Sequence, residues 1–402
     1  MNTLLRTIIS LRLTVILLGL GMVLVFFGTL DQVHTGIWET QRRYFESFFV
    51  VWKYPEQWPY FETLYFLRIP MPGGYLIGFA LLINLVAAHL YRFSLSWRKL
   101  GINLVHFGLI LLLVSELLTD LLAVESRMMI PEGETTYYTE DFRKNELAII
   151  DRSDPEVDTV HSISTNALKS GKPIEDPDLP VVVHPVRFFP NAAIARRQNA
   201  TGFPESPATQ GLGANRGTPD DLLIVPQPVR YDEETINTVS AFVRLETNEG
   251  ENLGTWLVSN VLDDRFPPQS FQVDGKSYQI DLRFKRYYHD FGLELIDFRF
   301  DRYPGTEIPK NFSSEVNIID PRDEGQRSAL IYMNNPLRYS GLTFYQASFD
   351  EETERATILQ VVRNPGWLLP YFSVLLMGAG MSYQFLFHLL RFNRKRKPKT
   401  TA

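Results

Sequence analysis

The feature that most constrains this sequence is a set of four apolar runs, each long enough to cross a bilayer. They lie at about 13–30, 74–91, 101–118 and 367–390. A helix needs about 20 mostly apolar residues to span the hydrocarbon core. The sequence therefore predicts a membrane protein with three N-terminal spans and one C-terminal span. A cleaved signal peptide is the alternative for the first run, but no small-x-small cleavage site follows it, so we interpret it as a retained anchor.

Positive charge gathers at three boundaries of these runs. The basic residues are Arg6 and Arg12 before the first run, Arg92, Arg98 and Lys99 between the second and third, and Arg391, Arg394, Lys395, Arg396 and Lys397 after the fourth. Lys and Arg near span ends mark the cytoplasmic side. Four spans put both termini on one side, and all three clusters agree that this side is the cytoplasm. We therefore expect residues 31–73 and 119–365 to be extracytoplasmic.

The predicted outer segment 31–73 is rich in aromatic residues, among them Trp38, Trp52 and Trp58. Its stretch 40–51 is amphipathic enough to lie in the interface as a helix. Two interpretations stay open for the aromatic residues. They form either an interfacial belt or a specific binding surface.

The large middle segment, 119–365, has the pattern of an all-β domain. Short alternating runs such as TVSAFVRLET, SYQIDLRFKRYY and GLTFYQASFD are separated by turn residues. This spacing predicts an antiparallel sandwich or a barrel-like stack of sheets. The stretch 191–221 is rich in Gly, Pro, Ala and Asn, and we expect it to be a mobile loop. The predicted domains are thus 1–118, 119–365, and 366–402 with its basic tail.

Composition excludes several kinds of chemistry. The chain has no cysteine, so it contains no disulfide, no iron–sulfur ligands and no CxxCH haem-attachment motif. The net charge is −6, and the acidic middle segment gives no reason to expect a nucleic acid partner. No nucleophile elbow, P-loop, dinucleotide fingerprint or HExxH occurs. We therefore predict no catalytic residues.

Three of the seven histidines fall in the predicted spans. His106 lies roughly 12 Å along its helix from Arg98, whereas His89 and His388 lie only about 4–5 Å from an arginine. All three are placed in the cytoplasmic half of the membrane, and His106 is deepest. Ionisable residues there usually face protein or a functional cavity, and neutral imidazole is a common axial ligand of haem iron. For His89 and His388 the alternative is simple snorkelling to the interface. Glu116, near the outer end of the same run as His106, is a weaker candidate.

Three stretches resemble a known family. They are INLVAAHLYRFSLSWRKLGINLVHFGLILLLVSELLTD, LELIDFRFDRYPGTEIPKNFSSEVNIID and IYMNNPLRYSGLTFYQASFD. The sequence is similar to ResB (CcsB), a component of the system II cytochrome c biogenesis machinery. The order of three helices, a large outer domain and one helix is also that of the family.

The resemblance implies a function in haem delivery. ResB-like proteins work with a ResC/CcsA-type membrane protein to move haem b across the bacterial inner membrane and present it to apocytochrome c. His106 matches the family's membrane histidine, an axial ligand of haem iron, and His89 is an alternative ligand without a family match. The tryptophan-rich WWD motif of the partner is absent from this chain. The chain is therefore expected to be a subunit of a haem lyase that is not catalytic alone.

Two other functions compete with this one. The chain could be a scaffold that binds the partner and apocytochrome without touching haem. It could also be a membrane-anchored sensor, although the short basic tail after Leu390 offers no output domain.

The charge pattern predicts the topology. Reporter fusions after Leu30 and Leu118 should be active outside the cytoplasm, and a fusion after Lys397 should be active inside it, because basic clusters resist translocation. An outward-facing C-terminal reporter contradicts the four-span topology.

Overall fold

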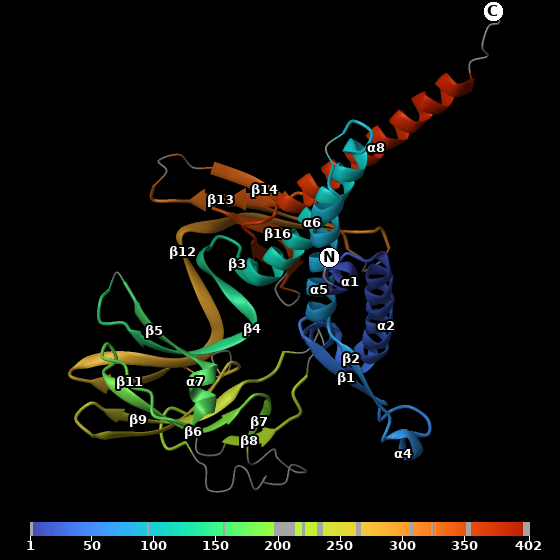
Figure 1. Cartoon of the computed structure of the whole chain (residues 1–402). Helices are drawn as coiled ribbons and strands as arrows, with labels where there is room; N and C mark the ends of the chain where they lie inside the picture. Colours follow the sequence, from blue (N-terminus) through green and yellow to red (C-terminus); the bar gives the residue numbers. More distant parts are fainter. Residues whose placement is uncertain are drawn as a thin grey trace, which may run out of the picture. The chain divides into compact units, whose positions relative to one another are not determined.

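The computed structural model describes residues 3–94, 96–155, 157–196, 214–218, 222–230, 236–262, 267–305, 309–322, 325, 327–350 and 355–396. The chain separates into two compact units (Figure 1). One unit holds the N-terminal part through Val124 and the C-terminal part from Arg363. The other holds the β-rich part between them.

Four helices are long and apolar enough to cross a membrane: α2 (Leu11–Thr35), α5 (Gly74–Arg92), α6 (Leu100–Leu122) and α8 (Leu369–Arg396). A short helix, α1 (Thr3–Ile8), precedes α2. Large apolar side chains such as Phe26 and Leu386 stay exposed on these helices, as they do on surfaces that meet lipid. The four predicted helices and the large β domain are confirmed.

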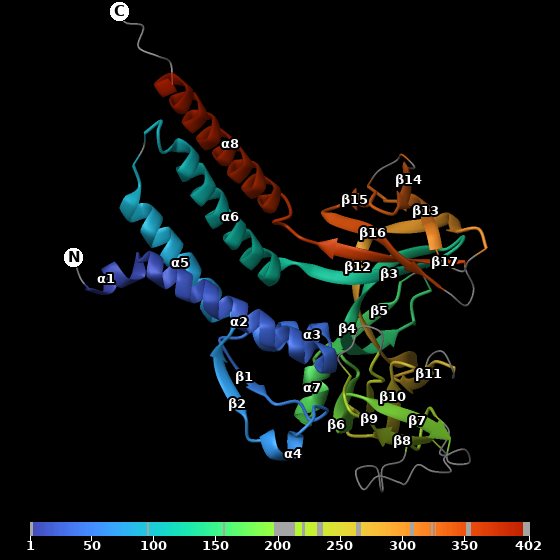
Figure 2. The same ribbon diagram turned by 90° about the vertical axis from the view of Figure 1, so that its right-hand side faces the viewer.

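Helices α6 and α8 lie side by side and touch through glycines (Figure 2). A Cβ atom added to Gly380 would lie 2.7 Å from the carbonyl oxygen of Gly101 and 2.9 Å from Leu104 Cβ. A Cβ atom on Gly108 would lie 2.7 Å from Met377 Cγ. Small residues let membrane helices approach closely, so these glycines set the spacing of the pair.

Helices α2 and α5 are joined by a buried amide. Asn84 on α5 is 2% exposed. Its Oδ1 accepts a hydrogen bond of 2.6 Å from the hydroxyl of Thr14, and its Nδ2 donates to the carbonyls of Ile8 and Ser10. The polar side chain is therefore satisfied within an otherwise apolar helix.

The aromatic segment between α2 and α5 is a compact structure of short elements. It contains α3 (Ile37–Thr40), the π-helix η1 (Gln41–Phe45), β1 (Phe49–Lys53), α4 (Phe61–Leu64) and β2 (Arg68–Pro72), with β1 and β2 antiparallel. The prediction of one interfacial helix over 40–51 is wrong beyond Phe45, because alternate residues Val50 and Trp52 turn inward as a strand.

An ion pair holds this segment to α2. The hydroxyl of fully buried Tyr44 donates to Asp31 Oδ2 at 2.6 Å, and Arg43 Nη1 lies 3.3 Å from the same oxygen. Burial, followed by the hydrogen bond to the Asp31 carboxylate, raises the pKa of Tyr44. Asp31 is thus a buried carboxylate with both a cation and a hydroxyl donor.

The β domain is antiparallel. Its strands are β3 (Val124–Pro131), β4 (Thr135–Asp151), β5 (Thr159–Ser164), β6 (Val181–Phe189), β7 (Ala192–Arg196), β8 (Leu222–Pro226), β9 (Ser240–Thr247), β10 (Asn252–Ser259), β11 (Gln269–Val273), β12 (Lys276–Arg302), β13 (Pro309–Ile319), β14 (Arg327–Tyr332), β15 (Leu337–Tyr339), β16 (Leu342–Phe349) and β17 (Ala356–Arg363). The largest sheet has the order β14-β13-β12-β4-β3-β17-β16-β15, and β11 and β5 pair with β12 and β4. A second sheet, β10-β9-β6, has three strands. One short helix, α7 (Thr165–Ser170), lies between β5 and β6.

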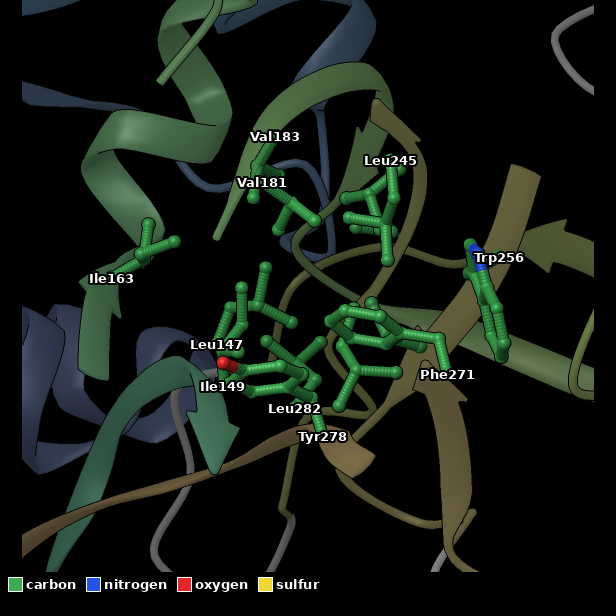
Figure 3. Packing of buried hydrophobic residues seen from close by; sticks show 14 of the residues in the cluster. Leu147, Ile149, Ile163, Val181, Val183, Leu245, Trp256, Phe271, Tyr278 and Leu282 are labelled. Carbon is green, nitrogen blue, oxygen red and sulfur yellow. The ribbon is translucent and has the colours of Figure 1, made fainter. Parts of the chain in front are cut away.

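Two cores stabilise this domain. The first lies between the three-stranded sheet and one half of the large sheet, where Leu147, Ile149, Val183, Leu245 and Leu282 pack together (Figure 3). The second lies within the other half of the large sheet. It contains Met128, Ile130, Phe291, Leu293, Leu295, Val316, Ile318, Ile331, Leu342, Phe344, Leu359 and Val361. The long strands β4 and β12 pair with each other and connect the two cores.

Most of the expected mobile loop, 191–221, lies outside the described residues. Its beginning forms β7, which pairs with β8 through contacts such as Ile194 with Ile224.

The glycine contact between α6 and α8 generates a prediction with a control on the same helix. Gly380→Ala should lower the free energy of unfolding by about 1–3 kcal/mol, because the new methyl group overlaps the backbone of α6. Gly378→Ala should be neutral or stabilising, because no atom lies within 4 Å of the added Cβ and Ala favours the helix. Unfolding of both variants in detergent micelles measures the difference, and equal stabilities contradict it.

Candidate functional site

His106 on α6 has one ring nitrogen engaged by the backbone. Its Nδ1 lies 2.8 Å from the carbonyl oxygen of Ile102, one helical turn earlier. A carbonyl oxygen can only accept, so Nδ1 donates to it, and in the neutral tautomer of this kind Nε2 keeps its lone pair. Metal-ligating histidines are commonly oriented by a hydrogen bond from the other ring nitrogen to a carbonyl. The ring is therefore fixed and has an available electron pair.

His89 on α5 lies beside His106. The ring centroids are 5.7 Å apart and the ring planes differ by 38°. The other face of His89 is close to Phe93, at 5.6 Å. The structure therefore brings the two candidate ligands together across the contact between α5 and α6.

His388 on α8 is the third membrane histidine, and it is held by a neighbour. Gln384 Nε2 lies 2.8 Å from His388 Nε2 and donates to it. The amide oxygen of Gln384 is buried and has no hydrogen-bond partner among the described residues. The sequence contains a signal for this pair, because Gln384 and His388 are polar residues one turn apart in an apolar helix. Their contact was not predicted from it.

A hollow of about 450 Å³ is lined by residues of α6 and α8. Its volume is typical of small-molecule sites. The lining is almost wholly apolar apart from the two histidines and the glutamine: Gly101, Ile102, Val105, His106, Met381, Gln384, Phe385 and His388. His106 and His388 therefore face one apolar groove.

These residues fit a haem group better than a bare metal ion. Among the described residues, no group of three or more His, Asp or Glu side chains is placed to hold a metal ion. A porphyrin brings four of its own nitrogen ligands, so it needs only one or two imidazoles from protein. An apolar wall and an oriented imidazole are present in the groove.

A second hollow, of about 520 Å³, lies between the N-terminal part of α5 and the C-terminal part of α6 and includes Glu116. There the Tyr75 hydroxyl donates to Asp120 Oδ2 at 2.8 Å. Burial, followed by the negative charge of Asp120, raises the pKa of Glu46 in the adjoining loop. Glu116 is thus remote from the histidines and belongs to a carboxylate-rich surface.

The other four histidines make local contacts. His34 accepts from Trp58 Nε1 at 3.1 Å, and His184 lies 3.4 Å from Glu246. His289 is within 3.2 Å of Thr139 Oγ1, and burial lowers its pKa. His161 lies on β5, opposite Ile149. These four histidines thus lie at separate places in the fold.

Comparison with known proteins identifies one part of the chain. Residues 268–364 match the model of the ResB-like family. This region is ResB-like. It extends from β11 to β17 and includes two of the three motifs that carry the resemblance, so the relationship inferred from the sequence is confirmed. The ResB-like match does not reach α6 and says nothing of His106.

Relatives with curated names agree with the match. Protein NrfI of Wolinella succinogenes is 35% identical over 102 residues, which are 25% of this chain and 11% of NrfI. The cytochrome c biogenesis protein CcsB of Synechococcus elongatus is 37% identical over 60 residues, 15% of this chain and 13% of CcsB. CcsB of Crocosphaera subtropica is 35% identical over 81 residues, 20% of this chain and 17% of that protein. The matches thus span less than a fifth of each relative.

The backbone contact of His106 predicts its tautomer. In protein labelled with ¹⁵N-histidine and free of haem, His106 should show a protonated Nδ1 and an unprotonated Nε2, because Ile102 provides only an acceptor. His106→Gln identifies the signal. NMR measurement of the opposite tautomer contradicts the placement of the ring.

Proposed function

We propose that this chain is a membrane subunit of a cytochrome c biogenesis machinery that binds haem b through His106. With a ResC/CcsA-type partner it would transfer haem across the bacterial inner membrane and present it to apocytochrome c. The observation that carries the proposal is the oriented imidazole of His106 on an apolar groove. The names of the CcsB relatives and the ResB-like region support the setting in cytochrome c biogenesis.

Each residue of the groove has a distinct task in this proposal. His106 Nε2 would hold the haem iron, while the Ile102 carbonyl keeps the ring in place. Val105, Met381 and Phe385 contact the porphyrin face and exclude water. Haem supplies the iron and the vinyl groups that later receive the cysteines of apocytochrome c.

The chain is not expected to complete the reaction alone. This chain would hold the haem through His106, and the partner protein would supply any further ligand. Both termini would face the cytoplasm and the β domain the periplasm, because the basic clusters lie at the inner ends of the helices. In that orientation His106 receives haem from the cytoplasmic side.

The ligand assignment is tested with the assembled complex. His106→Gly should remove most of the co-purifying haem and its low-spin absorption spectrum, and added imidazole should partly restore both by filling the vacated position. His89→Gly is the matched control, because its ring neighbours His106 without lining the groove. It should retain most of the haem.

Two outcomes contradict this assignment. Normal haem in His106→Gly together with loss in His89→Gly makes His89 the ligand. Normal cytochrome c maturation in both variants, with no haem on the wild-type complex, favours a scaffold that binds partner and apocytochrome only.

A further inference from the structure

The β domain contains a hollow of about 830 Å³ whose lining is strongly charged. Residues of β4, β5 and β12 form most of it. Its cations are Arg152, Arg283, Lys285 and Arg286, and its carboxylates are Glu146, Asp158 and Asp281. The lining therefore carries an excess positive charge in a chain whose net charge is −6.

An ion pair forms the floor of this hollow. Arg283 Nε lies 3.2 Å from Glu146 Oε1, and the two side chains are only 8% and 2% exposed. Glu146 also accepts from the Ser162 hydroxyl at 2.5 Å. Each oxygen of the Glu146 carboxylate therefore already accepts a hydrogen bond, Oε1 from Arg283 and Oε2 from Ser162.

Arg283 has donors to spare. A guanidinium has five N–H groups, and those of Arg283 bond only to Glu146 and to the Tyr288 hydroxyl, at 3.0 Å, among the described residues. A buried pair that is purely structural has its polar groups satisfied by protein, because unpaired buried donors are costly. The remaining N–H groups of Arg283 line the hollow instead.

Lys285 adds a cation without a counter-ion. In the described part of the chain no carboxylate lies within ion-pair distance of its Nζ, and the nearest partner is the ring of Tyr287, 5.4 Å away. The neighbouring cations are matched: Arg152 lies 3.4 Å from Asp158, and Arg286 lies 3.1 Å from Glu140. Lys285 is thus the cation of this hollow that has no acid partner among the described residues, and the buried carboxylate of Asp281 also belongs to the lining.

Aromatic rings complete one wall. The rings of Tyr138 and Tyr288 are 5.9 Å apart, and the Arg286 guanidinium lies 4.1 Å from the centre of the Tyr138 ring. Stacking of this kind holds a guanidinium in place. The wall is therefore held in place beside Arg283 and Lys285.

We propose that this hollow binds a carboxylate group, held by the spare N–H groups of Arg283 and by Lys285. A planar carboxylate matches the guanidinium fork, and its negative charge offsets the unpaired charge of Lys285. The carboxylate can belong to a free organic acid or to an Asp or Glu side chain of a polypeptide. The site is separate from the membrane histidines and does not depend on haem binding.

Calorimetric titration of the full chain in detergent micelles tests this inference. The probes are succinate as a free acid, hexaglutamate as a polypeptide carboxylate, and succinamide as the uncharged analogue of succinate. At least one of the first two should bind and succinamide should not. Binding of succinate identifies free acids as ligands, and binding of hexaglutamate alone identifies a polypeptide.

Variants on β12 locate the binding. Lys285→Gln should weaken the affinity about tenfold by removing the unpaired cation. Lys276→Gln is the control, because Lys276 is on the same strand, pairs with Asp151 at 3.4 Å and does not line the hollow. It should leave the affinity unchanged. The double variant Arg283→Met with Glu146→Leu replaces the buried pair without leaving an unpaired charge, and it should abolish binding while the chain stays folded.

Three results overturn the inference. They are no binding of either acidic probe, equal binding of succinamide, or unchanged affinity in both Lys285→Gln and the folded double variant.

Discussion

The contact between α6 and α8 joins the N-terminal and C-terminal parts of the helical unit. The chain enters the β domain from α6 into β3 and leaves it from β17 into α8. Strands β3 and β17 are neighbours in the large sheet, and the two helices are neighbours through Gly101, Gly108 and Gly380. The same pair of chain segments is thus joined by backbone hydrogen bonds in the sheet and by close packing in the helices. Because these glycines have no side chains, the two backbones approach closely and gain dispersion contacts. Such contacts stabilise helix pairs in lipid, where the hydrophobic effect does not drive association.

The histidine groove is a consequence of the same packing. Where Gly101 touches α8, the helices are in contact, and next to this contact the longer side chains of His106 and Phe385 border a hollow. Two pairs of polar side chains lie on these helices: Asn84 with Thr14, and Gln384 with His388. Such pairing lowers the cost of a polar side chain within an apolar helix. His106 satisfies one nitrogen with its own backbone and leaves the other available.

In the β domain, buried and half-buried charges are compensated by ion pairs. Glu146 and Arg283 are buried beside the first core, where an isolated charge would be very unfavourable, and they compensate each other. Arg286 and Glu140 form a second pair near the rim. The long strands β4 and β12 bring these groups together across a large separation in sequence. One register of this strand pair therefore determines both a stabilising network and the charge of the adjoining hollow.

The sequence by itself determined the four helices and the antiparallel β domain, because each depends on a local pattern: the length of an apolar run, or alternation. A polar residue within a span also singled out His106 as a candidate ligand. The tertiary structure decided which side chains meet. The approach of His89 to His106, the shared groove of His106 and His388, and the β1–β2 hairpin in the aromatic segment all depend on helix rotation and strand register. These are set by packing between residues distant in sequence, such as Gly101 with Gly380, and local periodicity does not contain that information.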